Sequence, residues 1–281
     1  MSDFDPDWLA LREPYDHAAR DPELPARFAA SLGDAPTIVD LGCGTGSNLR
    51  YLAPRLGREQ SWICVDHDQL LLRAAIDRIR AWAAASGWSL APAPGGIGVA
   101  APDFSIRVRL CAHDLARGPP PDLPAGAGVS ASALLDLTSA AWLDAFAGRC
   151  RQRPLLLALS FDGRLNFTPA DEDDEEVRRR FLRHQRTDKG FGPALGPDAA
   201  HFLADRLRKL AHEVQLAPSD WRLGGADRPL LTAKLEGLLS ATREIEDDAL
   251  LDGWAARRRA QAKAGELGLI VGHLDLLALP R

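Results

Sequence analysis

The sequence lacks both a signal peptide and any segment long and apolar enough to cross a membrane. Residues 1–5 contain no basic region followed by an apolar run. Nowhere does the chain approach the roughly 18 uninterrupted apolar residues that a membrane-spanning helix needs. We therefore expect a cytoplasmic protein with no membrane partner.

Cysteine is scarce, and its spacing excludes the common cysteine-based sites. The four cysteines are far apart, and no pair has the C-x-x-C spacing of a zinc site or a redox dithiol. They stand at Cys43, Cys64, Cys111 and Cys150. We expect reduced, mostly buried thiols and no bound metal.

Basic residues are not in excess either. The formal net charge is -5 at pH 7, which argues against a phosphate-rich partner held by bulk electrostatics. The run Arg257, Arg258 and Arg259 is one basic cluster on an acidic chain, so we interpret it as surface. Nucleic acid is not the expected partner.

What the chain does contain suits one α/β domain with insertions, since it has 281 residues, 46% of them hydrophobic and 26% charged. Apolar runs bounded by turn residues alternate with helical patterns, which predicts parallel strands joined by right-handed crossovers. The predicted strands are residues 37–41, 62–65, 106–111, 129–135, 155–159 and 214–216, with closing strands in 267–279. The pattern indicates a doubly wound sheet with helices on both faces.

Three segments fall outside this alternation. Residues 1–36 indicate short helices that precede the main domain at 37–281. Residues 91–102 are rich in Pro, Gly and Ala and predict a loop. Residues 164–197 form the longest insertion, between the fifth strand and the next helix.

A glycine-rich segment follows the first predicted strand. Asp40 precedes Gly42, Gly44 and Gly46, which let the backbone turn sharply and approach a ligand with no Cβ in the way. The helix that begins near Ser47 adds free amide groups. The spacing is G-x-G-x-G, whereas a dinucleotide fingerprint has G-x-G-x-x-G. Asp40 would repel a pyrophosphate and favour a ligand with an ammonium and a sulfonium.

Residues 39–46 read VDLGCGTG, which resembles the first motif of class I S-adenosylmethionine-dependent methyltransferases. The resemblance implies a doubly wound, mostly parallel seven-stranded sheet, preceded by an N-terminal helical lid. It also implies that Asp40, Gly42, Cys43 and Gly44 hold the cofactor S-adenosylmethionine. Cys43 is then a small filler and not a nucleophile.

Three later acids stand in the order that this family requires. Asp66 follows the second strand, where the family's acid accepts hydrogen bonds from the ribose hydroxyls, and a carboxylate offers acceptors only. His67 beside it is a candidate for the adenine edge. Asp114 follows the third strand and matches the acid that accepts from the adenine amino group, with Leu115 supplying backbone there. Asp136 closes the fourth strand, which faces the methionine end and the reacting methyl in the family.

The acceptor site is predicted at the carboxyl ends of the strands and in the segments that fold over them. From the lid, Arg12 is a candidate partner of the methionine carboxylate, and Tyr15 and His17 are candidate substrate residues. Asp162 and Arg164 follow the fifth strand.

The insertion contributes His184, in a polar and glycine-containing stretch typical of functional loops. A hydroxyl acceptor needs a general base, for which His17, His184 and Asp136 are the candidates. The sequence does not choose among these three.

The resemblance implies an enzyme, and we expect it to methylate an oxygen or nitrogen of a small-molecule metabolite, because the charge balance disfavours polymers. An RNA or protein methyltransferase is the alternative within that class. The Asn-Pro-Pro-aromatic motif of many base and amide methyltransferases is absent after the fourth strand. A non-catalytic subunit that binds S-adenosylmethionine is the third possibility. The sequence does not define the oligomeric state.

Overall fold

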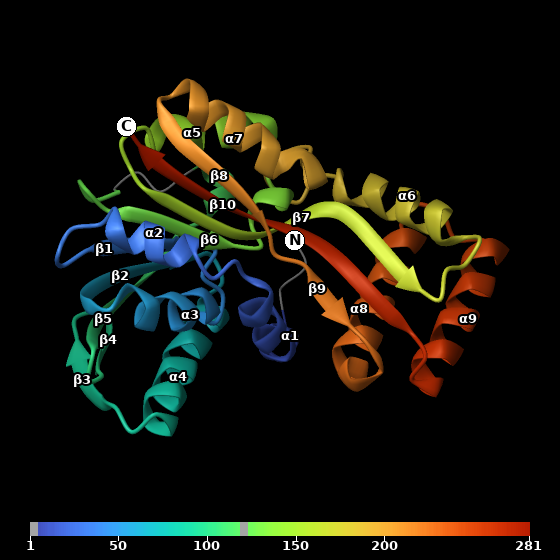
Figure 1. Cartoon of the computed structure of the whole chain (residues 1–281), viewed down its shortest axis with the longest axis horizontal. Coiled ribbons are helices and arrows are strands. Elements are labelled where there is room, and N and C mark those ends of the chain that lie inside the picture. The colour runs from blue at the N-terminus through green and yellow to red at the C-terminus, as the bar shows by residue number, and fades with distance from the viewer. Residues whose placement is uncertain (1–4, 119–122) are drawn as a thin grey trace.

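A single sheet organises the molecule (Figure 1). The computed structural model describes residues 5–118 and 123–281. In this range the sheet has ten strands in the order β3-β4-β5-β2-β1-β6-β7-β10-β8, with β9 paired to β10. The strands are β1 (Thr37–Leu41), β2 (Arg58–Asp66), β3 (Ser89–Ala93), β4 (Gly96–Ala100), β5 (Phe104–Ala112), β6 (Gly128–Ser132), β7 (Leu155–Thr168), β8 (His212–Pro218), β9 (Trp221–Leu223) and β10 (Gly268–Pro280). Among them only β4 and β10 run against the others.

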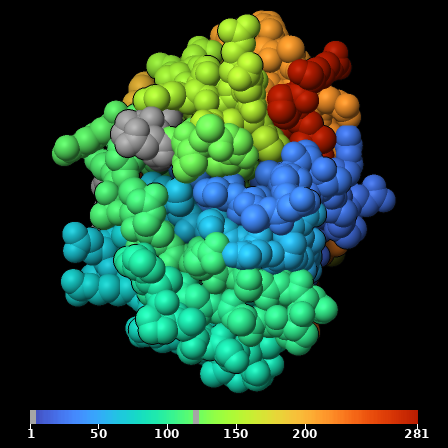
Figure 2. Space-filling view, turned by 90° about the vertical axis from the view of Figure 1, so that its left-hand side faces the viewer, coloured from blue at the N-terminus to red at the C-terminus, as the bar shows by residue number. Residues whose placement is uncertain are grey.

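The predicted fold class is confirmed, and the predicted strand number is corrected. The order β5-β2-β1-β6-β7-β10-β8 contains the seven expected strands, and β3, β4 and β9 are additional. The expected loop at 91–102 is wrong, because this segment is the hairpin β3–β4. A Cβ on Gly96 would lie 1.9 Å from the carbonyl oxygen of Val108, so this close strand approach requires glycine. Figure 2 looks onto the end of the molecule where this hairpin lies.

Helices cover both faces of the sheet, as expected (Figure 1). They are α1 (Pro6–Ala19), α2 (Leu24–Ala30), α3 (Ser47–Leu56), α4 (Gln69–Ala85), α5 (Ala140–Arg149), α6 (Asp174–Gln185), α7 (Ala199–Lys209), α8 (Arg228–Arg243) and α9 (Ala249–Ala264), with short 3₁₀ turns η1 (Leu115–Arg117), η2 (Leu135–Leu137), η3 (Gly196–Asp198) and η4 (Gly225–Asp227). Because successive strand residues point to opposite faces, Ile38 packs in the core with α2, α3 and α4, and Val39 in the core with α5 and α7. No helix of the described residues is long and apolar enough to cross a membrane.

Strand β7 is much longer than the predicted 155–159. Its burial alternates from Phe161 onward, with Phe161, Leu165 and Phe167 buried and the polar residues between them more exposed. The continuous apolar run ends at Leu159, but the alternating pattern continues the strand to Thr168, where it still pairs with β10. The predicted insertion boundary at residue 164 is therefore wrong, since that residue lies inside a strand.

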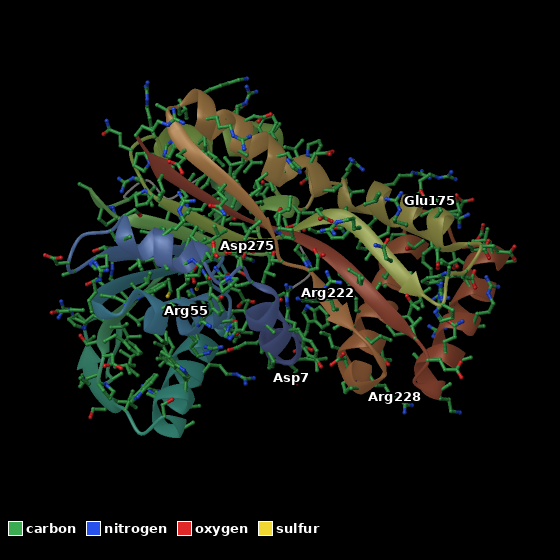
Figure 3. All side chains as sticks on the ribbon, viewed as in Figure 1. Asp7, Arg55, Glu175, Arg222, Arg228 and Asp275 are labelled. Atoms are coloured by element: carbon green, nitrogen blue, oxygen red, sulfur yellow. The ribbon has the colours of Figure 1, made fainter. Side chains whose placement is uncertain are left out.

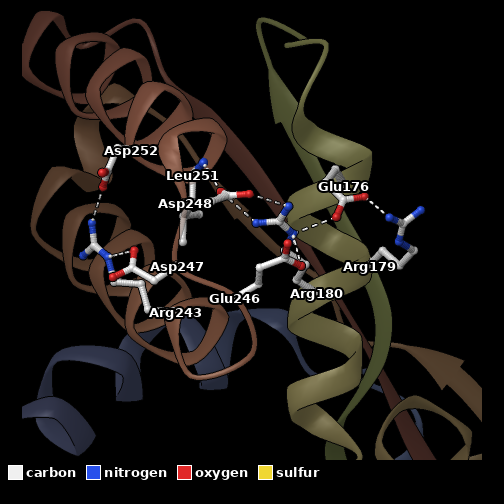
Figure 4. A network of polar contacts seen from close by, with 9 residues as sticks. All are labelled: Glu176, Arg179, Arg180, Arg243, Glu246, Asp247, Asp248, Leu251 and Asp252. Carbon is white, nitrogen blue, oxygen red and sulfur yellow. Dashed lines mark hydrogen bonds and ion pairs between the residues drawn. The ribbon is translucent and has the colours of Figure 1, made fainter.

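The far ends of β7 and β10 carry a third core, with α6, α8 and α9 around them (Figure 1). Arg180 links α6 to the start of α9, because its guanidinium bonds Glu176 at 2.7 Å and both carboxylate oxygens of Asp248 at 3.0 Å (Figure 4). Asp248 in turn accepts from the backbone amide of Leu251 and begins α9. This network fixes α6, whose last turn carries His184.

The N-terminal segment folds as two helices, α1 and α2, over the described part of residues 1–36, which begins at residue 5. The side chain of Asp5 accepts from the amide of Asp7 and caps α1. Helix α1 contacts β9 and α8, and it approaches the ends of the parallel strands.

Candidate functional site

A cavity of about 450 Å³ opens at the carboxyl ends of the parallel strands, within the range of about 300–1,000 Å³ typical of small-molecule sites. It lies where the sheet order reverses, since β2 and β5 extend from one side of β1, and β6 and β7 from the other. Such a switch point is where doubly wound sheets bind ligands. The cavity is lined by Leu9, Arg12, Gly42, Gly44, Asp66, His67, Asp68, Leu71, Asp114, Leu115, Ser132, Ala133, Leu134, Leu137, His184, Thr187, Asp188, Lys189, Gly190, Phe191 and Glu244.

The glycine loop forms one edge of this cavity. Gly42, Gly44 and Gly46 have φ values of 61°, 51° and 77°, a left-handed conformation that glycine adopts without strain. The amide of Gly44 donates to the Asp66 carboxylate at 2.9 Å. Cys43 is buried and its amide donates to the carbonyl of Val65 at 3.0 Å. The loop is thereby held against β2, and its two cavity-lining glycines leave room for a ligand.

Asp66 and Asp114 place carboxylates along the same wall. Asp66 ends β2, and Asp114 follows the end of β5, whose Ala112 pairs with Asp66. The second oxygen of Asp66 accepts from the amide of Asp68 at 3.0 Å, and Asp114 accepts from the amide of Ala116 at 3.0 Å. These amide bonds orient both carboxylates and leave lone pairs free for a ligand. Leu115 lies beside Asp114 on the same wall.

Asp40 is fully buried and does not line the cavity. One of its oxygens accepts from the Asn48 amide at 2.6 Å, and Asn48 accepts from Arg20 at 2.6 Å. The other oxygen has no hydrogen-bond partner. Burial raises the pKa of Asp40 to about 7, although Asn48 and Arg20 oppose this. Asp40 was expected to lie near the methionine end of the cofactor. Its side chain instead bonds Asn48 and so connects the end of β1, next to the glycine loop, to α3.

Stability should respond to pH through Asp40. Its pKa in the folded chain, about 7, lies above the value of about 3.9 expected for an unfolded chain. The folded state therefore binds this proton more tightly, and the free energy of unfolding falls as pH rises from about 4 to about 7. Asp40→Asn keeps a carbonyl oxygen for Asn48 and removes the titration. In urea unfolding at pH 5 and pH 8, the variant should gain stability relative to the wild type at pH 8. A difference between the two proteins that does not change with pH would contradict this assignment.

Arg12 of α1 also lines the cavity. Its guanidinium bonds both oxygens of Asp16 at 2.8 and 3.1 Å and lies 5.0 Å from the centroid of the Trp221 ring. Trp221 also donates to Asp16 at 3.0 Å. Leu9, one turn earlier on the helix, would lie 3.4 Å from a Cβ on Gly44. Helix α1 thus covers the glycine loop.

The last turn of α6 and the segment after it also line the cavity, with His184, Lys189 and Phe191. Asp188 accepts from the amides of Gly190 and Gly192 at 2.7 and 2.9 Å, which holds the turn. The Phe191 ring packs edge-on against Trp142 at 5.6 Å, and Trp142 donates to the carbonyl of Leu115 at 2.7 Å. Through Trp142, the predicted functional loop is therefore connected to the backbone of Leu115, the residue next to Asp114.

His184 is fixed by two charged neighbours. Its Nε2 lies 3.1 Å from a Glu244 carboxylate oxygen. The Lys189 ammonium lies 3.2 Å from Nε2 and 3.4 Å from Nδ1. Burial, and then the charge of Lys189, lower the pKa of His184. Glu244 opposes this shift, so the imidazole lies between an acid that favours its charged form and a cation that disfavours it.

Other predicted site residues do not line the cavity. His17 contacts the hydroxyl of Ser47 at 3.0 Å and packs on Tyr51, where it supports the start of α3. Tyr15 packs against the third core. Asp162 and Arg164 bond each other, and Arg164 also bonds Asp220 at 2.7 Å.

Asp136 lies in η2 and not at the end of a strand, because β6 stops at Ser132. It is buried behind Leu134 and Leu137, two cavity-lining neighbours on the same turn. Burial raises the pKa of Asp136 to about 6, against the opposing charges of Arg12 and Lys234. Its Oδ1 has no hydrogen-bond partner within the described chain.

Leu9, Asp68 and Glu244 line the cavity although the sequence did not single them out as site residues. Lys189 and Phe191 lie in the stretch 184–192 that was predicted as a functional loop, but no role was predicted for either residue. Glu244 follows α8, about sixty residues from His184 in sequence, and only the packing of α6 on α8 brings them together. Among residues 5–118 and 123–281, no group of His, Cys, Asp or Glu side chains is arranged to hold a metal ion.

Comparison with known proteins finds resemblance in structure only. No family model matches the chain, and no curated protein matches it either. A solved S-adenosylmethionine-dependent methyltransferase from Geobacter sulfurreducens, in complex with S-adenosyl-L-homocysteine, is 17% identical with a TM-score of 0.45, and 100% of each chain is covered. The cyclopropane synthase MmaA2 from Mycobacterium tuberculosis is 13% identical with a TM-score of 0.47, covering 98% of this chain and 94% of that one.

A Haemonchus contortus phosphoethanolamine N-methyltransferase 2, in complex with S-adenosyl-L-methionine, is 13% identical with a TM-score of 0.42. The match covers 92% of this chain, which spans 52% of the length of that protein. All three TM-scores lie below 0.5, so the function is argued from this chain's own residues.

Proposed function

We propose that the chain is a class I methyltransferase that uses S-adenosylmethionine as methyl donor. The observation that carries this proposal is the Asp66 carboxylate, held by the amide of Gly44 on the wall of a cavity at the switch point of the sheet. A left-handed glycine loop and an acid at the end of the neighbouring strand are what an adenosine with free ribose hydroxyls needs. An acid at this place also binds the ribose of a dinucleotide, and the G-x-G-x-G spacing, in place of G-x-G-x-x-G, favours S-adenosylmethionine over a dinucleotide.

The donor set of the cavity fits this cofactor. Asp66 would accept from the ribose hydroxyls, and Asp114 from the adenine amino group, with Leu115 beside it. Gly42 and Gly44 leave room for the chain that joins ribose to sulfur. Arg12 still has a guanidinium nitrogen beyond those that bond Asp16, and this nitrogen can meet the methionine carboxylate.

When bound, the cofactor supplies an electrophilic methyl group on a sulfonium. The chain's own contribution is alignment and exclusion of water. Leu9, Leu134 and Leu137 give the cavity an apolar lining beside its polar groups. Helix α1 and the segment after α6 contribute Arg12 and Phe191 to the same lining.

The acceptor is a small molecule. A cavity of about 450 Å³ that must also hold the cofactor leaves space for a metabolite and not for a folded polymer. Two alternatives remain testable, an RNA or protein methyltransferase and a subunit that binds the cofactor without turnover.

The first experiment is a comparison of ligands by thermal unfolding. At a concentration about 100 times Kd, S-adenosylmethionine should stabilise the chain by about 2.7 kcal/mol, which raises Tm by about 5–10 °C for a protein of this size. NAD at the same concentration should have no effect. Stabilisation by NAD alone would refute the proposal. Cofactor binding without label transfer to small molecules, RNA or protein extract would favour the non-catalytic subunit.

A further inference from the structure

The cavity is lined by charged groups of both signs. The ends of β2 and β5 contribute the carboxylates of Asp66, Asp68 and Asp114. The cations Arg12 and Lys189 line the same cavity, and the imidazole of His184 contacts both Lys189 and Glu244. A ligand that fills the cavity therefore meets both acids and basic groups.

Of the two cations that line the cavity, Arg12 and Lys189, only Lys189 forms no ion pair with a carboxylate of the described residues. Arg12 is held by a bidentate bond to Asp16. No carboxylate of the described residues forms an ion pair with Lys189, whose ammonium contacts the ring of His184. Burial lowers the pKa of Lys189, although the charge of Glu244 opposes the shift. A partly buried ammonium that lacks a counter-ion is stabilised by an anionic ligand.

The contacts of His184 argue against its use as a general base. Glu244 contacts Nε2 at 3.1 Å, and the Lys189 ammonium lies beside both ring nitrogens, 3.2 Å from Nε2 and 3.4 Å from Nδ1. An acceptor hydroxyl would therefore have to displace a charged neighbour to reach either nitrogen of this imidazole. An acceptor that is already deprotonated at neutral pH needs no such base.

We propose that the methyl acceptor is a small carboxylic acid whose carboxylate is bound by Lys189, and that the product is its methyl ester. This inference rests on the proposed function. His184 is a positioning residue, because its ring contacts the Lys189 ammonium, and Glu244 in turn contacts His184. The carboxylate would sit on the side of the cavity away from Asp66 and Asp114, which would repel it.

The reaction balances without a proton acceptor. A carboxylate oxygen forms a bond to the methyl carbon as the bond from that carbon to sulfur breaks. The electron pair of the broken bond stays on sulfur, so the sulfonium becomes a neutral thioether and the carboxylate becomes a neutral ester. No proton is released, which agrees with an imidazole that is occupied on both nitrogens.

Binding at Lys189 can be followed by NMR because the chain contains few lysines. Those of the chain are Lys189, Lys209, Lys234 and Lys263, and Lys209 and Lys263 are exposed on α7 and α9. After reductive methylation with ¹³C-formaldehyde, which keeps the charge, each lysine gives its own NMR signal. The protein, loaded with S-adenosylhomocysteine, is titrated with acetate, benzoate and succinate against chloride at equal ionic strength, and with inorganic phosphate in a separate arm.

The Lys189 signal, assigned by its loss in Lys189→Gln, should shift saturably with a carboxylate while those of Lys209 and Lys263 do not move. Lys189→Gln should weaken carboxylate binding about tenfold or more, as expected for a hydrogen bond to a charged group, and Lys209→Gln should leave it unchanged. The proposal would be overturned if carboxylates shifted the Lys189 signal no more than chloride does, or if only phosphate shifted it.

Turnover with methyl-labelled S-adenosylmethionine tests the ester. Label transferred to a carboxylic acid should be released as volatile methanol by mild alkali. Transfer only to alcohols or amines, in an alkali-stable form, would overturn the ester while leaving the methyltransferase intact. Failure of the cofactor to bind in calorimetry would instead refute the proposed function, so the two failures are distinct.

Discussion

Replacing Asp66 by alanine is expected to weaken binding of S-adenosylmethionine about 100-fold in isothermal titration calorimetry. The carboxylate would accept from two ribose hydroxyls, and a hydrogen bond to a charged group contributes about 1.5–3 kcal/mol. Two such bonds therefore account for about 3 kcal/mol or more, where each 1.4 kcal/mol is about tenfold in affinity. The substitution also frees the amide of Gly44, which donates to this carboxylate at 2.9 Å, so the glycine loop loses an anchor.

Asp68 provides a matched control for this experiment. It lines the same cavity two residues later, but its carboxylate caps α4 by accepting from the amides of Leu70 and Leu71 at 2.7 and 3.4 Å. Asp68→Ala should cost about 1 kcal/mol of stability and leave the affinity for the cofactor within a few-fold. Equal losses of affinity in both variants would indicate that general damage to this loop, and not the ribose contact, explains the effect.

The part of the fold that could be predicted is the part with an unambiguous hydrophobic period. The parallel strands at the centre are buried on both faces and appear in the sequence as continuous apolar runs. The β3–β4 hairpin does not appear as an apolar run. Close backbone approach requires glycine at Gly96 and Gly98, and a segment rich in glycine resembles a loop in sequence. The second half of β7 alternates buried and exposed residues. The predicted strand ended too early, at residue 159, because it followed only the continuous apolar run.

The site was predictable to the extent that its residues lie next to strand ends. Asp66 and Asp114 occupy the wall where the motif order predicted them. Asp40 follows the same pattern, yet its side chain points into the protein and binds Asn48, which no local pattern distinguishes. Glu244 and Lys189 become neighbours of His184 through the packing of α6 on α8 and the turn after α6. Contacts of this kind depend on tertiary structure, so no pattern of residue spacing in the sequence predicts them.

The buried network under the glycine loop explains why Asp40 is a structural residue. Arg20 lies at its centre, with its guanidinium bonded to Asn48 at 2.6 Å, 3.8 Å from Asp275 and 4.2 Å from the centroid of the Tyr51 ring. Asp275 of β10, near the middle of the molecule (Figure 3), accepts from the amide of Leu159 at 2.9 Å. One buried cation therefore serves acids on both β1 and β10.

Arg20→Met is accordingly expected to destabilise the protein by about 3–5 kcal/mol, the usual cost of leaving a buried charge without its partner. For a chain of this size that lowers Tm by about 6 °C or more. Urea and thermal unfolding measure both values. Arg55→Met is the matched control, because Arg55 also lies over the Tyr51 ring, at 3.7 Å, but is exposed at the surface (Figure 3).

The Arg55 variant should lose no more than about 1 kcal/mol, because exposed charges contribute little. Similar losses for the two variants would mean that stacking on Tyr51 and not the buried charge stabilises this region. The pH dependence separates the cases further. Without Arg20, the pKa of Asp40 and that of Asp275 should rise, since Arg20 lowers both. The destabilisation of Arg20→Met should therefore be larger at pH 8 than at pH 5, whereas loss of an aromatic contact would be the same at both.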